Sequence, residues 1–322
     1  MTGFEIIFDK VGVLGLLTLV GFIAYKIKLV PPDVKSGLEK LIFNLTLPVY
    51  IFTTISGFKY SGELLHNGLL VFVLSYAFLA FQYGLGWITS RAFHLDRKKS
   101  VVHNLHTTFG NVVFLGYPLI DVLFPGTPAL FYAAVYHLSQ MTVIWTFGVY
   151  KLGGNQAVGN LNKLKKLLNP NTIAFALGIL FMVLPVSLPE IVNQTFKGLG
   201  STTLYLSMIY IGMLMADFKL GWKSIGLDAI VLSANKLLLA PIIVMLILLL
   251  INQVFDNILS FPAFGAVVLQ SAMPCMAILV ILAKKYGSDE NSAMVNVFFS
   301  TLLSLITLPF LFWLVTELYG AI

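Results

Sequence analysis

The sequence predicts an all-α integral membrane protein with about ten transmembrane helices, arranged as a five-plus-five inverted repeat with two broken, crossing helices. Three observations lead to this fold class. First, 58% of the 322 residues are hydrophobic and only 11% are charged, and the mean hydropathy is +0.90. Second, apolar segments of about 20 residues, the length that crosses a hydrocarbon core, recur from end to end. Third, helix breakers interrupt two of these segments near their middles.

Short polar stretches separate the apolar segments along the chain. The segments span residues 6–27, 35–57, 64–90, 100–124, 128–151, 169–187, 190–216, 224–251, 260–284 and 290–317. Basic residues follow the first segment and no small-residue cleavage site does, so we interpret it as a membrane span and not as a signal peptide.

The basic residues alternate from loop to loop. One side holds Lys26, Lys28, Lys35, Arg91, Arg97, Lys98, Lys99, Lys151, Lys163, Lys165, Lys166, Lys219, Lys223, Lys284 and Lys285. The loops of the other side hold only Lys59. The positive-inside rule makes the basic loops cytoplasmic, so both termini are expected outside the plasma membrane. The net charge of +6 therefore indicates topology and not a nucleic-acid partner.

The two halves of the chain resemble each other in where their helices break. The first repeat is predicted over residues 1–152, a cytoplasmic linker over 153–168 and the second repeat over 169–322. The fourth segment is interrupted over 110–118 and the ninth over 271–274. Because five spans per half is an odd number, the second half enters the membrane from the opposite side, which makes the repeat inverted.

The breaks predict a binding site. A proline inside a helix leaves carbonyl groups without partners, and irregular backbone at membrane depth is tolerated only where it packs in protein or lines a wet cavity. The amino ends of half-helices favour an anion. A single break is usually a plain proline kink, but two matched breaks favour a substrate site. The residues expected nearest to it are Asn111, Gly116, Pro118, Met273 and Pro274.

Residues 110–119, with the sequence Gly-Asn-Val-Val-Phe-Leu-Gly-Tyr-Pro-Leu, resemble the fourth-span motif of the auxin efflux carrier family. Residues 45–48, 272–274, 283–287 and 300–304 are similar to further motifs of that family. The resemblance implies a fold like that of bile acid symporters and sodium/proton antiporters. In that fold spans 1, 2, 6 and 7 form a scaffold, spans 3–5 and 8–10 form a moving transport domain, and Asn111 contacts the substrate carboxylate. The chain lacks the long central loop of the plant members, which favours a bacterial carrier, and its expected substrate is a malate- or malonate-like dicarboxylate or an auxin-like monocarboxylate.

Other polar residues within the spans have both a functional and a structural interpretation. Lys236 is either a cation that neutralises carbonyl ends at the crossing, or a substrate counter-ion or proton-coupled group. Asp121 either pairs with Lys236, carries a proton or is a wetted surface carboxylate, and His106 either titrates or belongs to a solvated helix end. Residues that either face the substrate across the cleft or pack between helices are Pro48, Tyr50, Tyr205, Ser207 and Tyr210. His137 and Gln140 give the fifth span a polar face.

These observations favour a secondary transporter of a small organic anion over the other function classes. An enzyme is not expected, because the sequence has no His-Glu-x-x-His motif and Ser201 has no histidine in a matching span. A channel is disfavoured by the matched breaks. The single Cys275 excludes a disulfide framework and a cysteine zinc site, and no cofactor is expected. A cation antiporter or a bile-acid-type symporter is the alternative, and proton coupling and a homodimer stay open.

Overall fold

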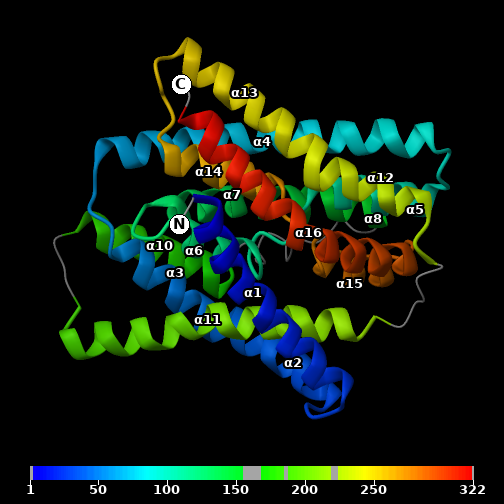
Figure 1. Ribbon diagram of the computed structural model, residues 1–322, viewed down its shortest axis with the longest axis horizontal. Coiled ribbons are helices and arrows are strands. Elements are labelled where there is room, and N and C mark those ends of the chain that lie inside the picture. The colour runs from blue at the N-terminus through cyan, green and yellow to red at the C-terminus, as the bar shows by residue number, and fades with distance from the viewer. Residues whose placement is uncertain (1–2, 155–167, 185–187, 219–223, 321–322) are drawn as a thin grey trace.

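The computed structural model describes residues 3–154, 168–184, 188–218 and 224–320. These residues form helices and a single isolated antiparallel bridge between Gly110 and Cys275, as Figure 1 shows. The helices of the first half are α1 (Gly3–Lys26), α2 (Pro32–Leu41), η1 (Ile42–Thr46), α3 (Leu47–Ser56), α4 (Gly62–Ala92), α5 (Arg97–Thr108), α6 (Gly116–Leu123), α7 (Ala129–Val143), η2 (Ile144–Gly148) and α8 (Val149–Gly153). Those of the second half are α10 (Pro170–Val183), α11 (Glu190–Ala216), α12 (Leu227–Ala234), η5 (Asn235–Leu239), α13 (Ala240–Val254), α14 (Phe261–Ser271), α15 (Ile278–Lys285) and α16 (Glu290–Tyr319).

The all-helical membrane class is confirmed in the described part of the chain. Five helical stretches are long and apolar enough to cross a membrane: Pro32–Ser56, Gly62–Ala92, Glu190–Ala216, Leu227–Val254 and Glu290–Tyr319. Shorter apolar helices cover Val11–Lys26, Pro170–Val183 and Phe261–Ser271. These eight helices fall in eight of the ten predicted segments, and the segments 100–124 and 128–151 contain α5, α6 and α7 instead. The count of ten membrane crossings stays a prediction. Most of the predicted linker, with Lys163, Lys165 and Lys166, lies outside the described residues, as do Lys219 and Lys223.

Polar residues define where several helices begin. Ser61 accepts a hydrogen bond from the backbone amide of Leu64 at the start of α4. Asn169 caps α10 in a capping box, in which its side chain and that of Thr172 each bond the other's backbone. Such caps satisfy amide groups that have no partner within the helix. The short loops are therefore set by local sequence.

Prolines close to the middle of two long helices follow a π-helical turn and do not break the helix. Pro48 is in the first turn of α3, directly after the π-helical turn η1. Pro241 is in the first turn of α13, directly after the π-helical turn η5. Because proline has no amide hydrogen, it cannot donate the regular α-helical hydrogen bond. The turn before it widens to a π-helical turn, and the helix then continues. These two predicted spans are therefore continuous, unlike the fourth and the ninth.

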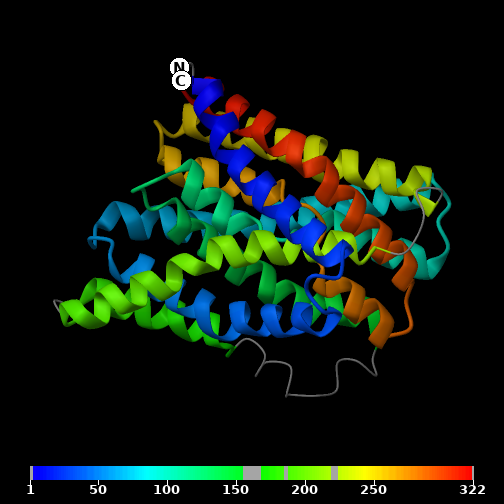
Figure 2. The same cartoon turned by 60° about the horizontal axis from the view of Figure 1, so that its bottom comes forward.

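The connections between helices gather at the two ends of the molecule (Figures 1 and 2). The α1–α2, α4–α5 and α15–α16 connections, which carry basic residues, lie at one end. The α3–α4, α6–α7 and α13–α14 connections lie at the opposite end, together with the start of α1 and the end of α16. This segregation matches the alternation of charge predicted from the sequence. Which end is cytoplasmic remains the prediction of the positive-inside rule.

The core lies around α7 and α14, whose residues are buried along almost their full length. The surrounding helices expose many large hydrophobic side chains, as expected for a surface in contact with lipid. The two broken helices, α5–α6 and α14–α15, therefore meet inside a shell of continuous helices.

Helix α1 packs directly on α11 through two glycines. A Cβ atom added to Gly212 would overlap the Thr18 carbonyl oxygen and the Phe22 amide nitrogen of α1, and one added to Gly21 would overlap the backbone of Ile209.

We expect Gly212→Ala to lower the free energy of unfolding by about 2 kcal/mol, because overpacking forces the two backbones apart. Thermal unfolding in detergent measures this. The matched control is Gly15→Ala in α1, which has no atom within 4 Å of its added Cβ and should leave the melting temperature unchanged or raise it.

Candidate functional site

The linkers of the two broken helices run antiparallel past each other and join by backbone hydrogen bonds. The amide of Asn111 donates to the carbonyl of Pro274 at 2.7 Å, and the amide of Met276 donates to the carbonyl of Phe109 at 3.2 Å. The helices break where the sequence analysis expected. Pro118 is the exception, because it lies in the first turn of α6, where a proline needs no hydrogen-bond donor. The break itself covers residues 109–115.

Glycine allows the two linkers to approach this closely. A Cβ atom added to Gly110 would lie 2.9 Å from both the Cβ and the carbonyl oxygen of Met273. One added to Gly116 would lie 2.6 Å from the side-chain oxygen of Gln270 in α14. Gly110 is therefore needed for the close approach of the two linkers, whereas at Gly116 the end of the Gln270 side chain would have to shift.

Gly110→Ala is expected to weaken the crossing. The added methyl group must displace the Met273 backbone, so we expect a loss of about 1–3 kcal/mol in the free energy of unfolding and a loss of transport at matched expression. Gly84→Ala in α4 is the control, because its added Cβ has no atom within 4 Å. Equal melting temperatures for both variants would contradict the close approach described here.

Buried side chains replace the backbone partners that the breaks remove. The Gln140 side chain of α7 forms two bonds with Gly110, accepting from its amide at 3.1 Å and donating to its carbonyl at 3.0 Å. Gln270 donates to the carbonyl of Val112 at 3.3 Å, and Ser300 of α16 accepts from the amide of Cys275 at 3.0 Å. Because unpaired backbone groups are costly at membrane depth, these bonds hold the irregular segments in place.

Lys236 is fully buried and lies close to the points where the first halves of the two broken helices, α5 and α14, end. Its ammonium group donates to the Thr108 carbonyl at the end of α5, at 3.0 Å, and to the side-chain oxygen of Gln82 at 3.2 Å. Gln82 in turn donates to the Ser271 carbonyl at the end of α14, at 3.2 Å. A cation at helix carboxyl ends complements their partial negative charge. The geometry fits the interpretation that Lys236 neutralises carbonyl ends.

Asp121 is not the ionic partner of Lys236. The ion pairs among the described residues are Lys35–Asp217, Lys99–Asp228 and Lys284–Glu290. Asp121 is half-buried in α6 and instead faces the hydroxyl group of Tyr50 in α3, although that hydroxyl makes no hydrogen bond of standard geometry.

Asn111 presents an unused polar group at the crossing. Only 7% of this residue is exposed, and its backbone amide is taken by Pro274. Its side-chain carboxamide forms no hydrogen bond to any described residue, unlike the neighbouring glutamines. A carboxamide can donate two hydrogen bonds and accept two. The Asn111 carboxamide is therefore a polar group at the crossing that is open to another molecule, and the side-chain oxygen of Gln270 also has no partner there.

Two tyrosines bring the neighbouring helices against the crossing. Tyr50 of α3 is 8% exposed and approaches Asp121. The ring of Tyr210 in α11 packs on the ring of Phe114, with centroids 5.0 Å apart. Tyr205, also predicted to face the site, is 53% exposed on the outside of α11. The structure thus brings together Tyr50, Tyr210 and the crossing, but not Tyr205.

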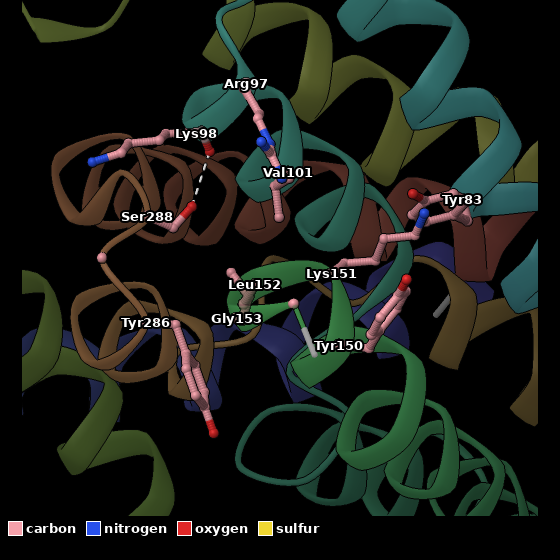
Figure 3. Close-up of a pocket in the computed structure, with 12 residues that line it drawn as sticks. Tyr83, Arg97, Lys98, Val101, Tyr150, Lys151, Leu152, Gly153, Tyr286 and Ser288 are labelled. Atoms are coloured by element: carbon pink, nitrogen blue, oxygen red, sulfur yellow. Dashed lines mark hydrogen bonds between the residues drawn. The ribbon is translucent and has the colours of Figure 1, made fainter. Parts of the chain in front are cut away.

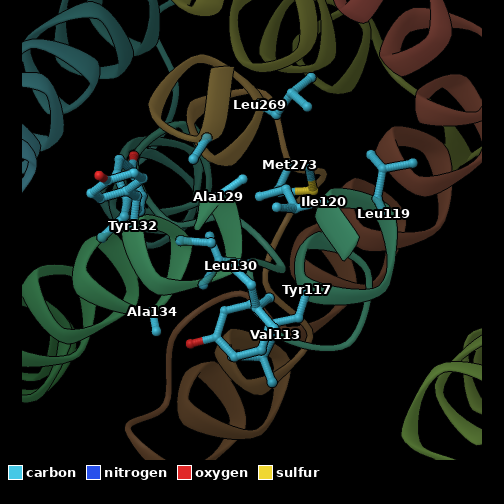
Figure 4. Packing of buried hydrophobic residues seen from close by; sticks show 14 of the residues in the cluster. Val113, Tyr117, Leu119, Ile120, Ala129, Leu130, Tyr132, Ala134, Leu269 and Met273 are labelled. Atoms are coloured by element: carbon cyan, nitrogen blue, oxygen red, sulfur yellow. The ribbon is translucent and has the colours of Figure 1, made fainter. Parts of the chain in front are cut away.

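The remaining predicted site residues shape the backbone or pack in the core. Met273 is fully buried, and Figure 4 shows its side chain beside Ile120 of α6. Gly116 and Pro118 are buried in the first turn of α6, and Pro48 is half-buried at the start of α3.

His106 connects α5 to the second broken helix and to α16. Its Nε2 atom lies 3.3 Å from the carbonyl oxygen of Met276, and its Nδ1 atom lies 3.4 Å from the side-chain nitrogen of Asn296. A neutral imidazole with its hydrogen on Nε2 satisfies both contacts. His106 is therefore held inside the bundle and is not part of a solvated helix end.

Gln82 and Gln270 were missed by sequence reasoning. Each lies inside a long apolar run and is completely buried. Polar side chains at membrane depth are the signal that would have found them, because they are expensive there without partners. The same signal had pointed to Lys236, Asp121 and Gln140 in the sequence, but Gln82 and Gln270 were not considered.

A basic pocket of about 590 Å³ opens at the end of the molecule that holds the basic loops. It is lined by Arg97, Lys98, Lys151, Tyr83, Tyr150 and Tyr286, among other residues (Figure 3). The ammonium group of Lys151 lies over the rings of Tyr83 and Phe147, 5.7 and 5.1 Å from their centroids. Clustered cations of this kind raise the local concentration of anions.

Comparison with known proteins identifies the chain as a membrane transport protein. A family described as "Membrane transport protein" matches residues 6–162 and 155–312. The chain belongs to this family of membrane transport proteins. One relative of this membrane transport protein is an uncharacterized transporter of Methanothermobacter thermautotrophicus, 25% identical over 296 residues that cover 91% of this chain and 93% of the relative. The family predicted from the motifs is confirmed at this level.

Proposed function

We propose that the protein carries a small organic anion across the plasma membrane by alternating access. The observation that carries the proposal is the Asn111 carboxamide, which is held at the crossing and forms no hydrogen bond within the described residues. A carboxylate accepts hydrogen bonds strongly from amide donors. Malate- or malonate-like dicarboxylates and auxin-like monocarboxylates are the substrates that the motif resemblance favours.

The movement follows from the predicted division into ten spans. In this proposal α1, α2–η1–α3, α10 and α11 form the scaffold, and the remaining helices move as the transport domain in a rocking or elevator motion. The Tyr50–Asp121 and Tyr210–Phe114 contacts join the two groups beside the crossing, so they must break as the transport domain moves. The inverted repeat supplies two related end states.

The charge distribution supports an anionic cargo. The basic pocket around Arg97 and Lys151 lies at the end proposed to face the cytoplasm and would attract anions from that side.

Ligand-dependent thermal stability of the purified protein tests the proposal. The panel holds malate, malonate, aromatic monocarboxylates, a bile acid and sodium. A ligand that binds only the folded state stabilises it by about 2.7 kcal/mol at a concentration 100 times its Kd, so a carboxylate should raise the melting temperature. Uptake of the same labelled acid into proteoliposomes should follow. A shift with sodium alone, or with sodium and the bile acid together, would replace the proposal with a cation antiporter or a bile-acid-type symporter.

A further inference from the structure

A small pocket lies between α3, α6, α7 and α10, next to the first turn of α6. Its volume is about 10 Å³, which is close to the space that one water molecule needs. Ile51 and Phe175 form part of its apolar wall, and Asn171, Tyr117 and His137 contribute polar atoms. The cavity therefore combines the size of one water with several hydrogen-bonding groups.

Asn171 is the unusual member of this cavity. The residue is 2% exposed, yet neither its side-chain nitrogen nor its side-chain oxygen has a hydrogen-bond partner in the structure. Its backbone amide is already taken by the capping side chain of Asn169 at 2.9 Å, so the Asn171 carboxamide does not cap the helix. Burying an unpaired amide costs roughly 1–3 kcal/mol, which implies that a partner outside the protein chain satisfies it.

The opposite wall offers a second unused polar atom. The Tyr117 hydroxyl and His137 Nδ1 are 2.9 Å apart in a hydrogen bond between α6 and α7. His137 is 4% exposed, and its Nε2 atom forms no hydrogen bond to a described residue. Asn171 and His137 thus line the same pocket, and each has a side-chain polar atom without a partner in the described chain.

We propose that this cavity binds one water molecule that bridges the carboxamide of Asn171 to Nε2 of His137. The two atoms of the carboxamide and the imidazole nitrogen supply three partners, the usual number for a buried water. A metal cation fits poorly, because calcium and magnesium take six or more oxygen ligands and this cavity has no carboxylate among its lining residues. The water satisfies groups that the protein chain leaves unpaired.

The proposed water lies between the scaffold and the transport domain. Its role as an exchangeable contact between them rests on the proposed function. Asn171 is on α10 of the proposed scaffold, whereas His137 and Tyr117 are on α7 and α6 of the proposed transport domain. The rings of Phe131 in α7 and Phe175 in α10 stack beside them with centroids 5.9 Å apart. A water-mediated bond keeps both polar groups satisfied and is easily exchanged, so this contact can break and re-form as the domains slide.

Direct observation of the wild-type protein tests the site. A cryo-EM or crystal map that resolves ordered water should show a density peak about 2.7–3.2 Å from both the Asn171 side chain and His137 Nε2. A map that shows other buried waters but none in this cavity would overturn the proposal. A peak with six close oxygen neighbours would overturn it in favour of a cation.

The change in melting temperature caused by Asn171→Leu has opposite signs for a hydrated cavity and for a dry one. In a hydrated cavity the variant loses hydrogen bonds and its melting temperature should fall. In a dry cavity it removes an unpaired amide and its melting temperature should rise. The matched control is Asn252→Leu, because Asn252 is 1% exposed and forms two side-chain bonds with Leu259, both at 3.0 Å. A fall in both variants supports the water, and a rise in Asn171→Leu alone overturns it.

Transport kinetics test the sliding role separately. Asn171→Leu should lower the turnover rate and leave KM unchanged, because the cavity is not part of the crossing. Unchanged turnover would overturn the sliding role. Failure of the organic-anion proposal would appear differently, as no carboxylate binding in the wild type despite a water peak in the cavity.

Discussion

Asn111→Ala is expected to weaken carboxylate binding by about 10- to 100-fold with little change in the melting temperature of the unliganded protein. A hydrogen bond to a charged group contributes roughly 1.5–3 kcal/mol, and each 1.4 kcal/mol is about tenfold in Kd. The folded protein itself loses little, because the Asn111 side chain forms no hydrogen bond to any described residue. Titration of the substrate identified by the thermal panel, into wild type and variant, measures the change.

Gln140→Ala is the contrasting control for Asn111→Ala. Gln140 bonds both backbone groups of Gly110, so its removal should lower the melting temperature even without ligand. Equal affinity of wild type and Asn111→Ala for the substrate would move the binding site away from the crossing. The two variants together separate a residue that binds from a residue that supports the backbone.

The sequence predicted the helical class and the positions of both breaks, because prolines and glycines act locally. It could not assign the right role to Pro118, since a proline in the first turn of a helix and one that interrupts a helix look the same without the hydrogen-bond pattern. The structure resolves this by starting α6 at Gly116. The sequence also could not identify the side chains that bond to the carbonyl groups at the breaks. Gln82 and Lys236 are distant in sequence from those carbonyl groups, which belong to Ser271 and Thr108.

Helical geometry explains why only one of two predicted tyrosines reaches the crossing. Tyr205 and Tyr210 are five residues apart, which places them about 140° apart around an α-helix. Tyr210 packs on Phe114, and Tyr205 consequently points outward with 53% of its surface exposed. The helical period of 3.6 residues predicts that Tyr205 and Tyr210 cannot both face the site. It does not predict which of the two does.

The tyrosines also bear on the predicted repeat. Residues 58–59 and 218–219 are both Phe-Lys, and each pair follows a tyrosine by eight residues, Tyr50 in one half and Tyr210 in the other. These two tyrosines are the ones that approach the crossing from the proposed scaffold, each against the first broken helix or its linker. Both contacts are with the first broken helix, whereas an inverted repeat would place the second tyrosine against the second broken helix. The repeat therefore stays a prediction from the sequence.

Lys236→Met is expected to lower the free energy of unfolding by about 3 kcal/mol, since two buried acceptors lose a partner and each such loss costs roughly 1–3 kcal/mol. The acceptors are the Thr108 carbonyl and the Gln82 side chain. Lys236→Gln keeps a donor in the cavity and should recover part of the loss. Lys99→Met is the control, because Lys99 forms a partly exposed ion pair with Asp228 at 3.1 Å, a kind of pair that contributes at most about 1 kcal/mol.

Thermal unfolding combined with carboxylate titration distinguishes the two roles of Lys236. A cation that neutralises helix ends predicts a large loss of stability in Lys236→Met and near-normal affinity in whatever fraction stays folded. A substrate counter-ion predicts the reverse, with a stable variant that no longer binds the anion. The first outcome is expected, because the ammonium group already has two partners, the Thr108 carbonyl at the end of α5 and the Gln82 side chain of α4. Both bonds would have to break before Lys236 could pair with a substrate.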